Sequence, residues 1–322
     1  MKRSIKKVAI LGSGTMGSGI AAHLANAGIH SYLLDIVPTE LTQEEIKKNL
    51  TLESPEVRNR ITSTNKKKFV LGVRPAAIMD KEDADLIKVG NMEDNLSWLS
   101  EVDWIIEVVS ESLEIKKQVI KKIVPFVKPG TIVSTNTSGI SVNKIAEDTP
   151  IEFRKYWLGT HFFNPVRYMK LLEIIPCNET LPEVIQFMAD FGERVLGKGI
   201  VYCKDTPNFI ANRIGASLGT NIIKLMMENN LTVSEVDAIT GTVIGRPGTG
   251  TFGLYDMVGL DIGVASATVV HDNVSDPEEK ERLTFPSFIY KMLDKKMLGL
   301  KTKCGFYKKQ GREKFMIDIN TL

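Results

Sequence analysis

A strand, a glycine-rich turn, a helix and a second strand at the start of the chain constrain its fold more than any other feature. Residues 7–11, KVAIL, have the composition of a buried strand, and an alanine-rich helix is expected after the turn. The turn holds three glycines in the order G-x-G-x-x-G: Gly12, Gly14 and Gly17. Such glycines permit a tight turn, let the backbone approach a pyrophosphate and let the helix pack on the strand. The unit predicts a doubly wound α/β domain that binds a dinucleotide; a glycine-rich turn without a ligand is the alternative.

The residue that ends the second strand indicates which dinucleotide is bound. That strand covers residues 31–34 and is followed by Asp35, with no arginine close behind it. A carboxylate at this point hydrogen-bonds the ribose hydroxyls of the adenosine and repels a 2′-phosphate. We therefore predict NAD rather than NADP. Thr15 and Met16, which lie inside the glycine motif, are assigned to the same cofactor site.

Polar residues follow two further apolar runs, WIIEVV at residues 104–109 and TIVS at residues 131–134, which are predicted strands of the same sheet. Ligands of open α/β sheets bind beyond the carboxyl ends of the strands. The polar residues beyond these two strands are therefore candidate ligand contacts: Glu111, Lys116, Asn136 and Ser138. A surface ion pair is the alternative for Glu111 and Lys116. A helix cap, which is compatible with ligand binding, is the alternative for the loop at Ser138.

The segment YWLGTHFFNPVRYMKLLEIIP, residues 156–176, predicts two strands joined by a short polar turn that contains a proline. His161 and Glu173 each lie six residues from Arg167, so a hairpin centred there puts them opposite each other. A carboxylate beside a histidine fixes its tautomer and favours its charged form, as a general base needs. A histidine that merely ends a strand and a glutamate on a solvated face are the alternative.

The chain divides into two predicted domains. An amphipathic helix and one more strand follow residue 176, and helical periodicity without a convincing strand extends over residues 207–294. The boundary is placed near Lys204, so residues 1–204 form a Rossmann-like domain with a doubly wound, mostly parallel sheet. Residues 205–322 form a smaller, all-helical domain.

A long helix is predicted to open the second domain. Thr206 is placed as its N-cap and Pro207 as its first residue. Asn212 then lies about five residues into the helix and faces the first domain. In the first domain, the charged residues 37–89 are predicted to form a helical excursion from the sheet. Within it, residues 66–68, KKK, form a solvated face or, as the less favoured alternative, meet a phosphorylated ligand.

Composition excludes several classes of function. The 41 basic and 39 acidic residues nearly cancel, which gives no electrostatic case for nucleic acid. No apolar run reaches membrane-spanning length, and the run after the basic start is too short for a signal peptide. The cysteines, Cys177, Cys203 and Cys304, lack metal-ligand spacing and suggest a reducing compartment. We predict a cytoplasmic protein without a metal site.

Seven segments together resemble the L-3-hydroxyacyl-CoA dehydrogenase family over nearly the whole chain: VAILGSGTMGSGIA, IIEVVSESLEIK, STNTSG, HFFNPVRYMKLLEII, KDTPNFIANR, GLYDMVGLD and LKTKCGFYKK. The combination of HFFNP with TPNFIANR is the most specific of these signals. The resemblance implies a Rossmann-like domain that holds NAD and a smaller helical domain that closes the substrate cleft and forms dimers.

The resemblance also implies roles for single residues. His161 looks like the general base of the family, and Glu173 like its carboxylate partner. Ser138 and Asn212 look like the groups that hold the substrate oxygen, and Asn164 like a neighbouring cleft residue. Four residues match family contacts of the cofactor: Asp35, Glu111, Lys116 and Lys301.

The chain departs from the family pattern at three places. Cys304 replaces a small residue or an acidic segment, and residues 37–90 fit so poorly that no contact with CoA is transferred there. The segment GRPGTGTFGLYDMVGLD is closer to members in which the dehydrogenase precedes an enoyl-CoA hydratase domain. Two interpretations of the apolar helices in the second domain therefore stay open: they form a homodimer, or a downstream domain covers them.

Three functions are consistent with these features. The first is NAD-dependent oxidation of L-3-hydroxyacyl-CoA to 3-oxoacyl-CoA in fatty acid β-oxidation, as the resemblance implies. The second is a dehydrogenase of the same fold that acts on a hydroxy or sugar acid without CoA. The third is a dinucleotide-binding structural or regulatory subunit without activity, against which the intact His161 and Glu173 argue.

Overall fold

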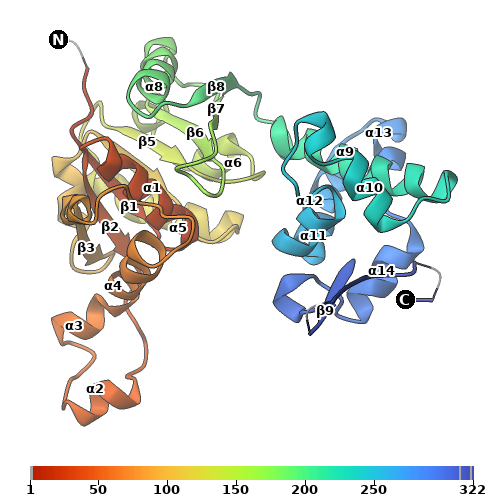
Figure 1. The fold of residues 1–322 in the computed structure, drawn as a ribbon. Helices are drawn as coiled ribbons and strands as arrows, with labels where there is room; N and C mark the ends of the chain where they lie inside the picture. The colour runs from red at the N-terminus through yellow and green to blue at the C-terminus, as the bar shows by residue number, and fades with distance from the viewer. Residues whose placement is uncertain (1–2, 312, 320) are drawn as a thin grey trace. The chain divides into compact units, whose positions relative to one another are not determined.

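The computed structural model describes residues 3–311, 313–319 and 321–322 and separates the chain into two compact units. The first unit ends at Thr206, and the second begins at Pro207 (Figure 1).

An eight-stranded sheet forms the centre of the first unit, with strand order β3-β2-β1-β4-β5-β6-β7-β8. Its strands are β1 (Lys7–Leu11), β2 (His30–Asp35), β3 (Ile87–Asn91), β4 (Trp104–Glu107), β5 (Ile132–Thr135), β6 (Trp157–Phe162), β7 (Leu171–Pro176) and β8 (Gly199–Tyr202). The strands from β3 to β6 in this order run parallel, β7 is antiparallel to β6, and β8 is parallel to β7. The predicted Rossmann-like, mostly parallel sheet is thereby confirmed.

Helices cover the sheet on both faces, which is why the central strands are continuous apolar runs rather than alternating ones. The helices are α1 (Thr15–Asn26), α5 (Leu113–Ile123), α6 (Val142–Ala146), α7 (Ile151–Arg154) and α8 (Pro182–Arg194), with short 3₁₀ turns at Leu96–Glu101 and Val124–Phe126. Helices α1 and α8 contribute side chains to one core cluster. In that cluster the rings of Phe191 of α8 and Trp104 of β4 pack edge-on, with their centroids 6.0 Å apart. This core holds the carboxyl ends of the strands in a fixed arrangement.

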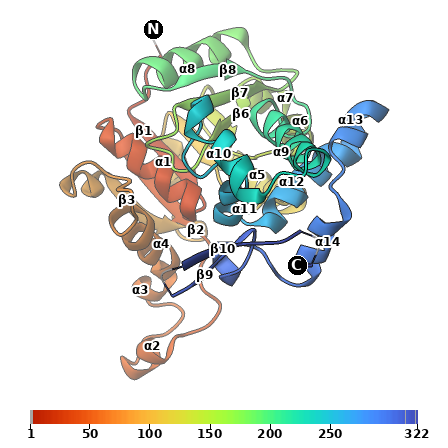
Figure 2. The same cartoon turned by 45° about the vertical axis from the view of Figure 1, so that its right-hand side comes forward.

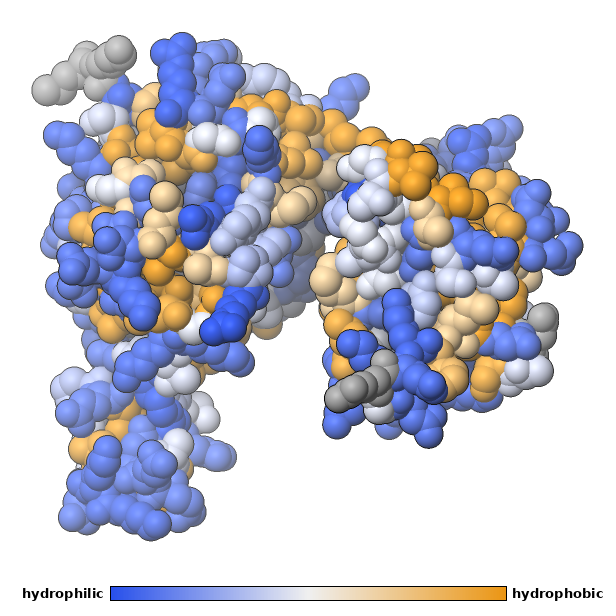
Figure 3. Space-filling view, viewed as in Figure 1, coloured by the Kyte–Doolittle hydropathy of each residue, from blue (hydrophilic) through white to orange (hydrophobic). Residues whose placement is uncertain are grey.

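An arm between β2 and β3 carries the charged segment of the sequence. It contains α2 (Gln43–Lys47), α3 (Pro55–Arg58), α4 (Arg60–Asn65), a π-helix (Lys66–Leu71) and a 3₁₀ turn (Glu82–Leu86). Helices α2 and α3 extend away from the sheet, and their surface is mostly hydrophilic (Figures 1 and 3). The predicted excursion is present, but strand β3 at its end was not predicted. The prediction of a solvated KKK face is wrong for Lys66, which is half-buried and donates to the carbonyl of Ile87 at 2.8 Å.

The second unit is built from helices and one small hairpin (Figure 2). Its elements are α9 (Ala211–Glu228), α10 (Val233–Ile239), a 3₁₀ turn (Thr242–Ile244), α11 (Phe252–Val258), α12 (Leu260–Asn273), α13 (Pro277–Arg282), α14 (Ser287–Asp294), a 3₁₀ turn (Leu300–Thr302), β9 (Tyr307–Gln310) and β10 (Glu313–Met316). The helical character is confirmed, whereas the β9–β10 hairpin was not predicted. Among the described residues no single helix is long and apolar enough to span a membrane, although the bent pair α11 and α12 together meets that length and composition.

The start of α9 differs from its prediction. The helix begins at Ala211 with Ile210 as N-cap, four residues after the predicted first position at Pro207. Asn208 and Phe209 adopt φ angles of 58° and 52°, which a right-handed helix cannot accommodate. The Asn208 amide donates to the carbonyl and hydroxyl of Ser266 at 2.8 and 2.9 Å, which stabilises this conformation. Asn212 therefore lies in the first turn of α9 rather than about five residues into the helix.

Candidate active site

The β6–β7 hairpin places a histidine directly opposite a glutamate. His161 and Glu173 are cross-strand partners in the antiparallel ladder, as the symmetry around Arg167 predicted. His161 Nδ1 lies 2.7 Å from Glu173 Oε2, and the two side chains are 5% and 0% exposed. The ring of Phe163 lies 4.3 Å from the imidazole, between ring centroids. A buried carboxylate at this distance favours the tautomer that carries a proton on Nδ1, and it stabilises a positive charge on the ring.

The loop after β5 is joined to the strand that carries His161. The Asn136 side-chain oxygen accepts a hydrogen bond from the Phe162 backbone N–H at 2.9 Å. Two residues before Asn136 and Phe162, the hydroxyls of Ser134 and Thr160 lie 2.7 Å apart. Asn136, predicted as a cofactor contact, thus lies at the same sheet edge as His161 and holds the end of β6. Ser138, two residues further, is exposed at this edge.

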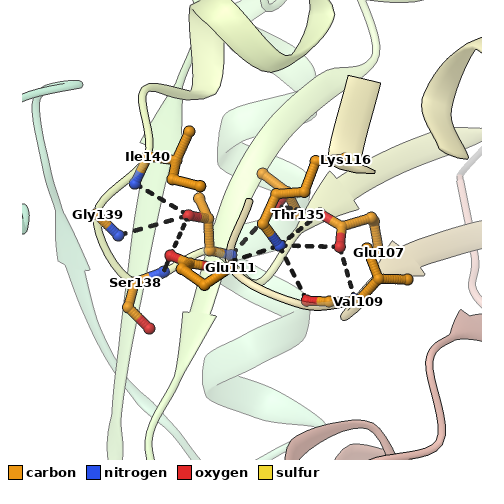
Figure 4. Close-up of polar contacts among 9 residues, drawn as sticks. Glu107, Val109, Glu111, Lys116, Thr135, Ser138, Gly139 and Ile140 are labelled. Atoms are coloured by element: carbon orange, nitrogen blue, oxygen red, sulfur yellow. Dashed lines mark hydrogen bonds and ion pairs between the residues drawn. The ribbon is translucent and has the colours of Figure 1, made fainter. Parts of the chain in front are cut away.

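A buried ion pair connects the ends of β4 and β5 with helix α5 (Figure 4). Lys116 Nζ lies 2.9 and 3.1 Å from the two carboxylate oxygens of Glu107, and the side chains are 1% and 0% exposed. Lys116 also donates to the carbonyl of Val109 at 3.3 Å, and the Thr135 hydroxyl donates to Glu107 at 2.6 Å. The alternative of a surface ion pair for Lys116 is therefore wrong, because this lysine is buried and its closest partner is Glu107.

Glu111 links this ion pair to the loop that carries Ser138 (Figure 4). One Glu111 oxygen lies 3.3 Å from Lys116 Nζ. The other accepts the Thr137 hydroxyl at 2.6 Å and the Ser138 backbone N–H at 2.7 Å. The Thr137 hydroxyl in turn accepts the backbone N–H of Ile140 at 3.0 Å. Ser138 is not the helix cap, because Ser141 caps α6 by accepting from the N–H of Lys144.

The three glycines of the turn after β1 are required for different reasons. A Cβ on Gly12 would lie 2.5 Å from the Val108 carbonyl oxygen, and one on Gly17 would lie 1.8 Å from the Gly12 carbonyl oxygen, so packing excludes both side chains. A Cβ on Gly14 would meet no atom of the described residues within 4 Å. The fold itself leaves room at Gly14, so packing does not require a glycine there, whereas the close approach of a pyrophosphate would.

The start of α1 and the end of β2 complete a site that fits a dinucleotide. Helix α1 begins at Thr15 with Gly14 as N-cap and has no side-chain cap, so its first N–H groups suit a phosphate. Thr15 is exposed and Met16 is half-buried at this end of the helix. Asp35 is the last residue of β2 and accepts the backbone N–H and the hydroxyl of Ser13 at 2.6 and 2.5 Å. The carboxylate therefore faces the glycine turn, as ribose recognition requires.

Three further predicted site residues lie in the loop after β6 and in the second unit. Asn164 is exposed in the loop after β6, in the first unit. Asn212 is half-buried in the first turn of α9, in the second unit. Lys301 belongs to the second unit as well, and its Nζ lies 2.5 and 2.6 Å from the two carboxylate oxygens of Asp261. The geometry within the first unit brings together His161 with Glu173, and it leaves the roles of Asn212 and Lys301 as predictions.

Sequence reasoning missed Glu107, Thr137 and Ser13. Glu107 interrupts the apolar run WIIEVV, and a charged residue inside a predicted buried strand was a usable signal of a buried ion pair. Thr137 and Ser13 carried no comparable signal, because hydroxyl residues in turns commonly bond to nearby backbone. Among the described residues no group of three or more metal-ligating side chains could hold an ion.

A glycine turn that fits a dinucleotide, on the same sheet as a buried histidine–carboxylate pair, is the arrangement of a nicotinamide-dependent dehydrogenase. Comparison with known proteins specifies the class. Residues 7–206 match the family described as 3-hydroxyacyl-CoA dehydrogenase, NAD binding domain, and residues 209–309 match 3-hydroxyacyl-CoA dehydrogenase, C-terminal domain. The chain belongs to the 3-hydroxyacyl-CoA dehydrogenase family, and its first unit is the NAD-binding domain of that family.

Individual relatives agree with this assignment and differ in length. The chain is 51% identical, over its whole length, to a probable 3-hydroxyacyl-CoA dehydrogenase of Bacillus subtilis, but it spans only 41% of that protein. It is 36% identical over its whole length to a putative fatty acid oxidation complex trifunctional enzyme of Rickettsia felis, of which it spans 43%. The crystal structure of (S)-3-hydroxybutyryl-CoA dehydrogenase from Ralstonia eutropha matches with a TM-score of 0.72 and 27% identity, over 94% of this chain and 98% of that one.

Proposed function

We propose that this chain catalyses the NAD-dependent oxidation of L-3-hydroxyacyl-CoA thioesters to 3-oxoacyl-CoA thioesters, a step of fatty acid β-oxidation. The observation that carries the proposal is the His161–Glu173 contact of 2.7 Å, buried on a hairpin of the sheet that also bears the glycine turn. A secondary alcohol loses a proton from oxygen and a hydride from carbon when it is oxidised. The pair provides the base, and the NAD-binding domain provides the place for the hydride acceptor.

In this proposal His161 takes the proton of the C3 hydroxyl at Nε2, on the opposite edge of the ring from Glu173. The Glu173 carboxylate holds Nδ1 and stabilises the imidazolium that forms, because their opposite charges attract strongly in a buried environment. The nicotinamide of bound NAD supplies a hydride acceptor. The Ser138 hydroxyl, exposed at the same sheet edge, is proposed to orient the substrate oxygen; Asn212, on the second unit, stays a predicted contact of that oxygen.

The substrate class is tested by turnover of acetoacetyl-CoA with NADH, in parallel with free acetoacetate and a panel of non-thioester oxo acids. Oxidation of NADH in the presence of acetoacetyl-CoA, but not of the compounds that lack CoA, supports the proposal. Turnover only with the acids that lack CoA would favour the second candidate, a same-fold dehydrogenase of hydroxy or sugar acids. Binding of NADH without turnover of any compound would favour a non-catalytic dinucleotide-binding subunit.

We further propose that the second unit, residues 205–322 in the predicted division, takes part in substrate binding and forms a homodimer. Exposed apolar side chains at helical spacing on α9 support an association surface: Ile214, Leu218 and Leu225 are 62%, 44% and 54% exposed. The chain spans about two fifths of two of its curated relatives. Cover by a downstream enoyl-CoA hydratase domain of a longer polypeptide stays the alternative to a homodimer. A cytoplasmic location is also proposed, because three cysteines that lie far apart in the sequence suggest a reducing compartment.

A further inference from the structure

Lys116 is buried in a position where its charge serves other protein groups. Its ammonium contacts both oxygens of Glu107, the carbonyl of Val109 and one oxygen of Glu111, and the side chain is 1% exposed. A direct contact with a cofactor, which the family resemblance implies, would require the ammonium to leave these partners. We propose that Lys116 and Glu107 are positioning residues, which fix Glu111 and through it the backbone of Ser138. This inference rests on the proposed function, in which Ser138 orients the substrate oxygen.

The ion pair between Lys116 and Glu107 is not explained by stability alone. Removing two charges from water is costly, and their mutual attraction only roughly offsets this cost, so a pair of apolar side chains would serve the core as well. The pair instead occupies the point where β4 and β5 both end, at the edge where ligands of such sheets bind. Both Glu107 oxygens are used, because the Val109 N–H and the Thr135 hydroxyl also donate to them at 2.7 and 2.6 Å.

Glu111 connects the buried Lys116 ammonium to the loop after β5. Its side chain is 45% exposed, and an exposed carboxylate without a partner would move among several rotamers. The ammonium of Lys116, 3.3 Å from one oxygen, favours the rotamer in which the other oxygen accepts from Thr137 and Ser138. The Ser138 backbone N–H is thereby held by a charged acceptor at 2.7 Å, stronger than a neutral one. The side chain of Ser138 consequently projects from a fixed backbone.

The neighbouring lysine provides a matched control. Lys117, one residue further on α5, also pairs with two carboxylates, those of Glu147 and Asp148. These partners are 53% and 76% exposed, and they follow directly after the last residue of α6. Exposed pairs of this kind contribute little, because solvent screens them. Substitution of Lys117 removes the same charge from the same helix without touching the Glu111–Ser138 contact.

The experiment compares Lys116→Met with Lys117→Met by hydrogen–deuterium exchange over residues 136–141. We expect the amides of this loop to exchange about tenfold faster in Lys116→Met, the effect of weakening one hydrogen bond to a charged group, and unchanged in Lys117→Met. At saturating NADH and acetoacetyl-CoA, kcat should fall about 10- to 100-fold in Lys116→Met, the cost of a misplaced group. NADH affinity, measured by fluorescence, should fall less than kcat does, because in this inference Lys116 acts through Glu111 and Ser138 rather than on a cofactor atom.

A second variant covers the case in which Lys116→Met fails to fold because Glu107 is left buried without its partner. Thr137→Val keeps the ion pair and removes the hydroxyl that joins Glu111 to the loop. Because the Thr137 hydroxyl also accepts from the N–H groups of Gly139 and Ile140, the readout for this variant is the Ser138 amide. Its exchange should rise and kcat should fall, as in Lys116→Met. When both variants fold, the double variant should lose no more kcat than the worse single one, because both changes break one path.

Three results would overturn the inference. The first is unchanged exchange over residues 136–141 in both Lys116→Met and Thr137→Val. The second is a loss of NADH affinity of tenfold or more in Lys116→Met with kcat kept at saturation, which would mark Lys116 as a direct cofactor contact. The third is full additivity of the kcat losses. A wild-type chain that fails to turn over acetoacetyl-CoA would refute the proposed function instead, and the exchange measurement would still decide the positioning role.

Discussion

Two histidine–carboxylate pairs in this chain have similar contact distances and different surroundings. In the first unit, His161 Nδ1 lies 2.7 Å from Glu173, and both side chains are buried on adjacent strands. In the second unit, His271 Nδ1 lies 2.9 Å from Asp272, its neighbour on α12, and the side chains are 38% and 64% exposed. Solvent competes for the exposed pair and screens its charges, whereas the buried pair is held by two strands. Contact distance alone therefore does not distinguish the proposed base from His271; burial and the strand framework do.

Removal of each histidine should separate the two pairs most strongly. His161→Gln should lower kcat by about 10²- to 10⁴-fold, the usual contribution of a general base, with little change in NADH affinity. His271→Gln, the matched control, should leave kcat within about twofold, because its partner lies in solvent. Steady-state kinetics with acetoacetyl-CoA measure both. A His161→Gln enzyme with near-normal kcat would contradict the assignment of the base.

Neutralising the carboxylate partners should give a smaller difference of the same sign. Glu173→Gln keeps the size of the side chain but removes the charge that stabilises the imidazolium, so kcat should fall about 10- to 100-fold, as for other groups that orient a functional residue. Asp272→Asn should have no measurable effect. The measurement is kcat for both variants at saturating substrate. Equal rates for Glu173→Gln and the wild type would reduce Glu173 to a packing residue.

A third histidine shows how burial changes the pKa of an imidazole whose hydrogen-bond partner is a neutral carbonyl instead of a carboxylate. His23 of α1 has Nε2 3.0 Å from the Leu196 carbonyl oxygen, and its Nδ1 is buried without a partner among the described residues. Burial, and next the nearby Lys198 ammonium, lower the pKa of His23 to about 4. The unfolded chain therefore takes up the proton first as the pH falls. The stability from neutral His23 is fully present above pH 6.5 and is lost between pH 6.5 and about 4.

The corresponding loss in the free energy of unfolding between pH 7.5 and pH 5 is about 2 kcal/mol, at about 1.4 kcal/mol per pKa unit. Urea unfolding at the two pH values measures it. His23→Asn should flatten this dependence by that amount, and His30→Asn, at an exposed position, should not. Parallel pH profiles for the wild type and His23→Asn would show that His23 is not buried in the neutral form.

A substitution on the surface of the second unit should change the oligomeric state, and its effect on activity should be the smallest of these. Leu218→Glu places a charge among the exposed apolar residues of α9 and should convert a dimer of about twice 35.8 kDa into a monomer, as seen by light scattering. Leu52→Glu, at an exposed leucine of the first unit, should leave the mass unchanged. A wild-type chain that is monomeric at micromolar concentration would reject the homodimer and favour cover by a downstream domain.

The sequence predicted those parts of the site that depend on local pattern. The glycine spacing located the turn after β1, and the equal distances of His161 and Glu173 from Arg167 predicted their pairing, because an antiparallel ladder joins residues by counting from its turn. It failed at the start of α9, where Asn208 and Phe209 adopt positive φ angles that depend on a contact with Ser266, far along the chain. The burial of Lys116 was missed for the same reason: its depth depends on Glu107 and the packing of α5 on the sheet, which no local pattern reveals.

The β6–β7 hairpin has a consequence for how such a chain can change its length. Successive residues of a strand face opposite sides of the sheet, so inserting or deleting one residue between position 161 and the turn, or between the turn and position 173, would slip the ladder and turn one of the two side chains to the other face. Insertions at the tip of the loop, residues 164–168, leave the ladder in place. Length variation in related chains, and any engineered peptide insertion, should therefore be tolerated at the tip and forbidden a few residues away on either side.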